Sequence, residues 1–196
     1  MSKDYDINLW DLSPKGDAQP KHIGHNEYPV RSVRFNKDGT MIVSGDNKGF
    51  IKIWDYKGKL MGKIKGHETS IYYVEFSTNS KYITSASQDG TIKKWSVTEA
   101  IKNNKISSPS RLNKPLEVLQ GHTGPVNRTS FHPHNSQIIV SASDDGTVRI
   151  WKFREINSPK NEVKKIEDLL AQSCVILEKY LPTNIQVSPE DRGVCL

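Results

Sequence analysis

The sequence has few cysteines, no long apolar run and a low overall apolar content. Two cysteines among 196 residues exclude a scaffold held together by disulfides. No segment approaches the roughly 20 consecutive apolar residues that cross a bilayer. The first residues, Met1 to Asp6, contain no apolar core of a secretory signal. We therefore expect a cytoplasmic protein with no membrane partner.

The charge is basic without being concentrated anywhere. Lysine and arginine number 28 and aspartate and glutamate number 22, which gives a formal net charge of +6. The lysines are scattered along the chain, for example at Lys52, Lys81 and Lys105, with no dense basic cluster and no motif of interleaved aromatic residues. Nucleic-acid binding usually needs such a patch, so we expect a solvated basic surface and no nucleic-acid partner.

An internal repeat organises the first three quarters of the chain. The pair Gly-His occurs three times, and the interval from each histidine to the next repeat tryptophan is 29, 28 and 29 residues. A constant interval of this kind indicates repeated structural units, which should be sought before any other pattern. The residues that carry the repeat are Gly24-His25, Gly66-His67, Gly121-His122, Trp10, Trp54, Trp95 and Trp151.

Each unit contains the same succession of strands and turns. Residues 30–35, 71–76 and 126–131 alternate between apolar and polar types, which is the period-two pattern of a strand with one buried face. Asp89-Gly90 and Asp145-Gly146 precede the tryptophan strands, and Asp-Gly between two strands favours a tight hairpin. Strands at this spacing without intervening helices predict an all-β protein.

These motifs resemble the WD-repeat family of β-propellers, and the resemblance covers about residues 2–154. It implies a partial WD-repeat propeller of about three and a half four-stranded blades, followed by a short C-terminal helical tail. We expect residues 1–154 to form the propeller segment and residues 155–196 the tail. Within the segment we expect one incomplete blade and three repeats, at residues 1–23, 24–56, 66–97 and 121–153.

The resemblance also implies a hydrogen-bonded set in each repeat, built from the Gly-His histidine, a strand hydroxyl, the turn aspartate and the tryptophan. In the first repeat Lys48 stands where the turn aspartate is expected. A Ser/His/Asp trio has the composition of a catalytic triad, but an enzyme needs one active site and not one in every repeat. We expect a structural role, no cofactor, no metal and no enzyme activity. The sets are His67, Ser85, Asp89 and Trp95; His122, Ser141, Asp145 and Trp151; and the partial set His25, Ser44 and Trp54.

The same resemblance places partner-facing positions early in the first strand of each repeat and just before the turn aspartate. Tyr72 and Arg31 are the strongest candidates, because tyrosine and arginine are enriched at the energetic centres of interfaces. We expect a non-catalytic scaffold that binds proteins or peptides. The six candidate positions are Arg31, Asn47, Tyr72, Gln88, Asn127 and Asp144.

The start of the chain aligns with the middle of a repeat. Residues 2–7 correspond to residues 87–92, so the first two strands of that blade are missing from the sequence. Closure of a propeller removes exposed sheet edges, and an open array is unusual. Three explanations remain: a piece of a longer protein, self-association that completes a ring, or a marginally stable fold. We favour the first.

The tail after Lys152 has a different pattern. Apolar residues from Ile166 to Leu181 recur at intervals of three and four, which predicts an amphipathic helix. Parts of the tail resemble the C-terminal ends of bacterial, notably cyanobacterial, multi-domain WD-repeat proteins, which implies a scaffold or signalling protein. The alternative is the sensor module of a signal-transduction NTPase whose catalytic domain lies elsewhere. Cys174 and Cys195 are expected to be small buried residues.

Overall fold

The computed structural model describes residues 5–10, 20–105 and 114–154. All of them lie within one compact unit that extends from Met1 to Arg154. The predicted tail at residues 155–196, with its helix and both cysteines, lies outside the described residues. Within the described part of the chain, no helix combines the length and the apolar character needed to cross a membrane.

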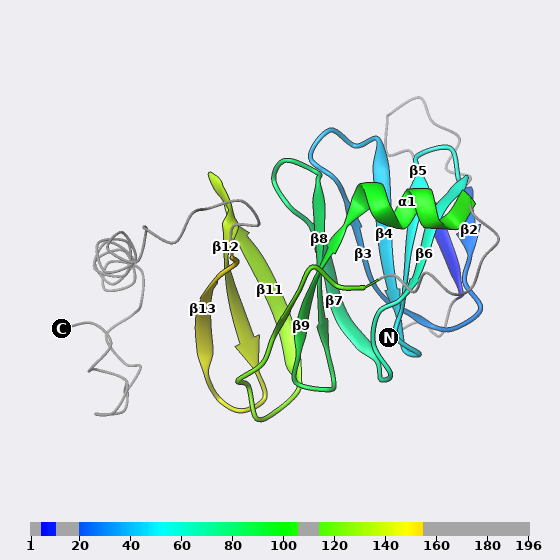
Figure 1. The fold of residues 1–196 in the computed structure, drawn as a ribbon. Helices are drawn as coiled ribbons and strands as arrows, with labels where there is room; N and C mark the ends of the chain where they lie inside the picture. Colours follow the sequence, from blue (N-terminus) through cyan, green and yellow to red (C-terminus); the bar gives the residue numbers. More distant parts are fainter. Residues whose placement is uncertain (1–4, 11–19, 106–113, 155–196) are drawn as a thin grey trace, which may run out of the picture. The chain divides into compact units, whose positions relative to one another are not determined.

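Four antiparallel sheets follow one another along the chain (Figure 1). The first pairs β1 (Asp6–Leu9) with β2 (Lys21–His25). The second has the order β3 (Val30–Phe35), β4 (Met41–Asp46), β5 (Phe50–Asp55) and β6 (Leu60–Lys65). The third has the order β7 (Ile71–Phe76), β8 (Tyr82–Ser87), β9 (Ile92–Ser96) and β10 (Glu117–Leu119). The fourth contains β11 (Val126–His132), β12 (Asn135–Ser143) and β13 (Val148–Lys152).

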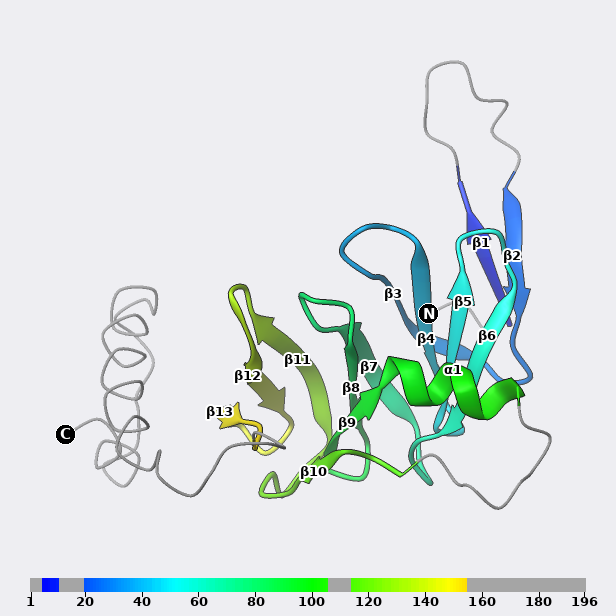
Figure 2. The same cartoon turned by 45° about the horizontal axis from the view of Figure 1, so that its top comes forward.

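The sheets pack face to face, and the apolar residues of alternate strand positions fill the spaces between them. One core cluster joins the second sheet to the third through Ile51, Ile71 and Trp95. Another joins the third sheet to the fourth through Tyr73 and Phe131. The first strands of the three repeats, β3, β7 and β11, are neighbours in space (Figures 1 and 2). This arrangement confirms the all-β class and the partial propeller.

The fourth strand of a blade comes from the segment before the next Gly-His pair. β6 pairs with the tryptophan strand β5, and β10 pairs with the tryptophan strand β9. Each Gly-His pair therefore stands between the last strand of one blade and the first strand of the next. Within the part of the chain that the structure describes, the fourth sheet has three strands and β13 is at its edge.

A helix occupies the start of the polar insertion that follows the third tryptophan, a feature that the all-β prediction did not contain. α1 (Val97–Lys105) is capped at its N-terminus by the preceding Ser96, whose Oγ accepts a hydrogen bond from the backbone N–H of Glu99 at 3.2 Å. Ser-x-x-Glu is the pattern that initiates helices. Val97 and Ala100 are buried, and the helix crosses β6 (Figure 2).

The segment that leads from one blade to the next is held by a close backbone approach to a turn of the blade that it leaves. Gly49 has a φ of +83°, and a Cβ at this position would lie 1.9 Å from the carbonyl oxygen of His67. The carbonyl of Gly49 accepts hydrogen bonds from the backbone N–H groups of Gly66 at 2.8 Å and His67 at 3.1 Å. Only glycine tolerates this combination of a left-handed backbone and a direct contact. Gly90, with a φ of +78°, occupies the equivalent place beneath His122.

Candidate functional site

The structure brings His67, Ser85, Asp89 and Trp95 together in the third sheet. The Nδ1–H of His67 donates to Oδ2 of Asp89 at 2.9 Å, and its Nε2 accepts from the Ser85 hydroxyl at 2.7 Å. The indole N–H of Trp95 donates to the same hydroxyl oxygen at 2.9 Å. Every polar group of the set has a partner, which removes the cost of burying them.

The electrostatics of this set keep its carboxylate ionised. Burial by itself would raise the pKa of Asp89, but hydrogen bonds from His67 and Thr91 hold that pKa well below its usual value. Burial lowers the pKa of His67, and the neighbouring Asp89 offsets part of that effect. The stable arrangement at neutral pH is therefore a neutral imidazole that donates to a carboxylate.

The second set has the same geometry one blade further on. The Nδ1–H of His122 donates to Oδ2 of Asp145 at 2.7 Å, and its Nε2 accepts from Ser141 at 2.7 Å. The indole N–H of Trp151 donates to Ser141 at 2.7 Å. The repetition of one geometry in two blades indicates a device that holds strands together and not a single reactive centre.

The partial set of the first repeat is only half formed, and His25 is not part of it. The indole N–H of Trp54 donates to Ser44 at 3.1 Å as the motif implies. The exposed His25 instead lies 2.7 Å from Oδ1 of Asp6, between β2 and β1. The physical reason is the absence of a turn carboxylate at Lys48. Without that acceptor, no hydrogen bond orients the imidazole towards Ser44.

Asp46 supplies the carboxylate of that turn from two residues earlier. Its Oδ1 accepts hydrogen bonds from the backbone N–H groups of Lys48 at 2.9 Å and Phe50 at 3.0 Å. Burial raises the pKa of Asp46, and these two hydrogen bonds counteract the rise. The alignment of the repeats missed this residue because serine stands at the same place in the other two repeats, at Ser87 and Ser143.

The two serines of the complete sets are not placed to act as nucleophiles. Ser85 and Ser141 are 0% and 2% exposed, and each hydroxyl already contacts both a histidine and a tryptophan. A catalytic triad needs an exposed nucleophile beside an oxyanion site. Among the described residues, no group of three or more His, Cys, Asp or Glu side chains is placed to hold a metal ion.

The six partner-facing candidates lie at one end of the blades, in three matching pairs. In each repeat the backbone N–H of the turn candidate donates to the carbonyl of the residue directly before the first strand. Arg31 and Asn47 therefore lie together on the second sheet, as do their equivalents on the third and fourth sheets. The donors and acceptors are Asn47 to Pro29 at 3.1 Å, Gln88 to Ser70 at 2.9 Å and Asp144 to Pro125 at 2.9 Å. We call these six residues the candidate face.

Contacts within the candidate face link neighbouring positions. The guanidinium of Arg31 lies 5.8 Å from the centroid of the Tyr72 ring, across the boundary between the second and third sheets. On the fourth sheet the side-chain amide of Asn127 donates to Oδ1 of Asp144. Both contacts hold exposed or half-exposed side chains in defined positions, which lowers the entropy lost when a partner binds.

A further cluster of polar side chains lies on β3, β7 and β11, the first strands of the three repeats. The sequence analysis did not predict it. The guanidinium carbons of Arg34 and Arg128 lie 4.7 Å and 5.3 Å from the centroid of the Tyr73 ring, and Nε of Arg34 donates to the Tyr73 hydroxyl at 3.2 Å. Beside them, Thr129 donates to Oε1 of Glu75 at 3.1 Å. Burial raises the pKa of Glu75 to about 7, although Thr129 and both arginines act in the opposite direction. No sequence signal marks these contacts, because they join three different repeats.

Comparison with known families identifies the repeats. The family described as "WD domain, G-beta repeat" matches residues 18–55, 58–96 and 113–152. Together these segments cover more than half of the chain, so the protein belongs to the WD-repeat family. Each matched segment begins several residues before its Gly-His pair, because the family unit starts in the outer strand of the preceding blade.

Several curated eukaryotic proteins are similar to the chain. A WD repeat-containing protein WDS homolog of Arabidopsis thaliana is 31% identical over 81% of this chain and 28% of its own length. A guanine nucleotide-binding protein subunit beta-like protein of Encephalitozoon cuniculi is 30% identical over 76% of this chain and 44% of its own length. A ribosome biogenesis protein YTM1 of Vanderwaltozyma polyspora is 28% identical over 77% of this chain and 42% of its own length.

The chain spans less than half the length of these relatives. All three come from eukaryotes, and they give no support to the resemblance of the tail to bacterial proteins. The family assignment rests on the repeats, which lie in the described residues, whereas the bacterial resemblance rested on residues 168–192 outside them.

Proposed function

We propose that this protein is a non-catalytic scaffold that binds proteins or peptides through the candidate face. The observation that carries the proposal is the repeated backbone hydrogen bond that brings a first-strand residue and a turn residue to the same end of each blade. Rigid strands hold these positions, while their side chains differ from blade to blade. Loop and strand-end positions on a rigid frame are where binding residues usually occur.

Three further observations support a binding role over a catalytic one. The serine hydroxyls of the complete hydrogen-bonded sets are buried and already form hydrogen bonds within their sets. The candidate face is exposed or half-exposed and includes Arg31 and Tyr72, residue types that dominate interface energetics. The relatives include a protein that resembles a subunit of a guanine nucleotide-binding protein, which supports an interaction role for this chain by similarity.

A peptide-binding selection tests the proposal. Peptides selected from a displayed library against the purified chain should lose at least tenfold in affinity when Arg31→Ala and Tyr72→Ala are combined. The matched control is Tyr56→Ala, which removes an exposed tyrosine between β5 and β6, away from the candidate face. Equal binding by the double variant and the control would show that the candidate face is not the binding surface.

The alternative function is a sensor module that regulates a signal-transduction NTPase on another domain or chain. No phosphate-binding Gly-rich loop with its Lys-Ser or Lys-Thr occurs in this sequence, so the NTPase would be a partner. The two functions differ in one measurable respect. A sensor module would change the hydrolysis rate of the NTPase to which it binds, whereas a scaffold would leave that rate unchanged.

A further inference from the structure

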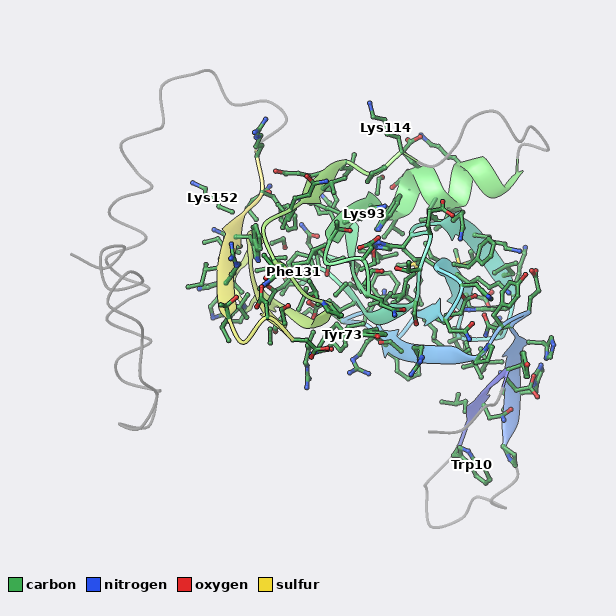
Figure 3. The ribbon with its side chains drawn as sticks, turned by 90° about the horizontal axis from the view of Figure 1, so that it is seen from below. Trp10, Tyr73, Lys93, Lys114, Phe131 and Lys152 are labelled. Carbon is green, nitrogen blue, oxygen red and sulfur yellow. The ribbon has the colours of Figure 1, made fainter. Side chains whose placement is uncertain are left out.

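The inner strands carry a second candidate binding group, formed by Arg34 on β3, Tyr73 on β7 and Arg128 on β11. We call these three residues the arginine–tyrosine cluster. β7 lies between β3 and β11, so the two arginines approach the ring from the strands on either side (Figures 1 and 2). Figure 3 shows Tyr73 at the edge of the blade array beside β3. Both arginines are exposed, while Tyr73 is 8% exposed.

The ring of Tyr73 fixes the positions of both charges. Nε of Arg34 donates to the Tyr73 hydroxyl at 3.2 Å, and one of its terminal nitrogens donates to the carbonyl of Val33 at 2.7 Å. Arginine stacks on aromatic faces and keeps its remaining N–H donors directed outward. Preorganised guanidinium groups bind carboxylates with a smaller loss of side-chain entropy than mobile lysines do.

The positive charge of the cluster is not balanced within the described residues. Neither Arg34 nor Arg128 is within ion-pair distance of a carboxylate in that part of the chain. Glu75 is close enough for both arginines to lower its pKa, but it forms no direct ion pair with either of them. Glu75 accepts from Thr129, and burial raises its pKa to about 7, so it carries only part of a charge at neutral pH.

We propose that the arginine–tyrosine cluster binds an acidic peptide segment of a partner protein, with one carboxylate on Arg34 and another on Arg128. The inference rests on the proposed scaffold function and specifies the chemistry of the partner. Because both guanidinium carbons lie close to one ring centroid, they are no more than about 10 Å apart, which matches carboxylates two or three residues apart on an extended chain. The Arg31–Tyr72 contact adds a third guanidinium on the neighbouring positions of the same strands.

An acidic peptide fits the cluster better than a single-stranded nucleic acid. Proteins that bind single strands combine basic residues with aromatic faces on which the bases stack. Here Tyr73 is buried and its ring is covered by two guanidiniums, and Tyr72 is contacted by Arg31. The cluster therefore offers charge for phosphates but no free stacking surface among these residues.

Binding of two labelled peptides to the full 196-residue chain tests the inference. The first peptide alternates glutamate with serine over ten residues, and the second replaces every glutamate by glutamine. Fluorescence anisotropy should show saturable binding of the glutamate peptide only. The variant Arg34→Gln/Arg128→Gln should weaken that binding at least tenfold.

The matched control is Lys37→Gln/Lys81→Gln, which removes the same charge from two exposed turns at the other end of β3 and β7. It should change the affinity less than twofold. An equal loss in both variants would show a general effect of net charge and would overturn the inference. So would stronger Arg34- and Arg128-dependent binding of a ten-nucleotide single strand, since the site would then prefer nucleic acid.

A measurement on the unmodified chain covers the case in which the arginine variant does not fold. A glutamate peptide that carries a photo-crosslinker should react with β3, β7 or β11, and crosslinks elsewhere would overturn the inference. If neutral or basic library peptides bind and their affinity depends on Tyr72 alone, the inference fails but the proposed scaffold function stands. Both fail if no peptide of any composition binds.

Discussion

The hydroxyl of Thr129 donates to Oε1 of Glu75 at 3.1 Å, across the boundary between the third and fourth sheets. Val33 and Val74 are apolar at the position that Thr129 occupies, so this repeat alone presents a donor there. The threonine gives the buried carboxyl group a partner whether it is protonated or ionised. One polar substitution in a repeated apolar position thus accommodates a titratable group between two blades.

Replacing Glu75 by glutamine should stabilise the protein at alkaline pH. The folded pKa of about 7 lies above the ordinary value of 4.5, so the folded state holds the proton more tightly than the unfolded state. Stability from this group is complete below pH 4.5 and is lost as the pH rises through 7. At pH 8 Glu75→Gln should be more stable by roughly 1–3 kcal/mol, and at pH 4.5 the two proteins should differ little.

Urea unfolding at pH 4.5 and pH 8 measures this effect. Glu68→Gln is the control, because the Glu68 side chain is 90% exposed and should change neither curve by more than about 0.5 kcal/mol. Parallel pH profiles for the wild type and Glu75→Gln would show that Glu75 titrates normally.

Removal of the His67 imidazole should destabilise the fold far more than removal of the His25 imidazole. His67→Ala leaves the buried Ser85 hydroxyl without its acceptor and removes one of the donors to Asp89, which should cost about 2–4 kcal/mol. His25→Ala removes an exposed contact with Asp6 and should cost less than about 1 kcal/mol. Guanidinium unfolding of the two variants checks the difference, and equal losses would contradict the structural role of the set.

Substitution of Asp46 should destabilise the protein more than substitution of Lys48, although the repeat alignment places the turn aspartate at residue 48. Asp46→Ala removes the acceptor for two backbone N–H groups and should cost about 1–3 kcal/mol. Lys48→Ala, at the aligned position of the turn aspartate, should stay within about 0.5 kcal/mol of the wild type. Chemical unfolding midpoints distinguish the two, and a larger loss in Lys48→Ala would refute the assignment of the turn to Asp46.

Comparison with a second glycine separates the two costs of a side chain at Gly49, the collision with the His67 carbonyl and the strain of a left-handed backbone. Gly39 has a φ of +72° with open space around its missing Cβ, so Gly39→Ala should cost about 1 kcal/mol. Gly49→Ala adds a direct collision with the His67 carbonyl and should cost at least about 3 kcal/mol. Thermal unfolding of both variants tests this, and similar melting temperatures would mean that the segment containing His67 can shift away from the turn at little cost.

The sequence predicted those features that depend on residues within one repeat. The Gly-His to tryptophan interval and the Asp-Gly turns were enough to place the strands, because both reflect a fixed local geometry that recurs. The helix α1 was missed because its nine residues interrupt an otherwise all-β pattern, although Ser96 and Glu99 carry the signal for its start. His25 was misplaced because the motif was carried over without the carboxylate on which it depends.

Contacts between repeats could not be predicted in the same way. Tyr73 and Arg128 occupy the same aligned position of their strands, whereas Arg34 lies two residues beyond that position on β3, so no aligned column of the repeat contains all three. Their proximity follows from the packing of β7 between β3 and β11. Glu75 and Thr129 likewise meet only after the third and fourth sheets have packed.

A left-handed glycine beneath the second and third Gly-His pairs gives these two boundaries between blades the same construction. Gly49 lies directly against the carbonyl of His67, and Gly90 occupies the equivalent place with the His122 carbonyl oxygen 3.3 Å from the position of a Cβ. A chain built on such a boundary can gain or lose a whole repeat, or exchange one for another, without the need to evolve a new contact. The side chains of the candidate face can therefore change from blade to blade while the junctions between blades keep their construction.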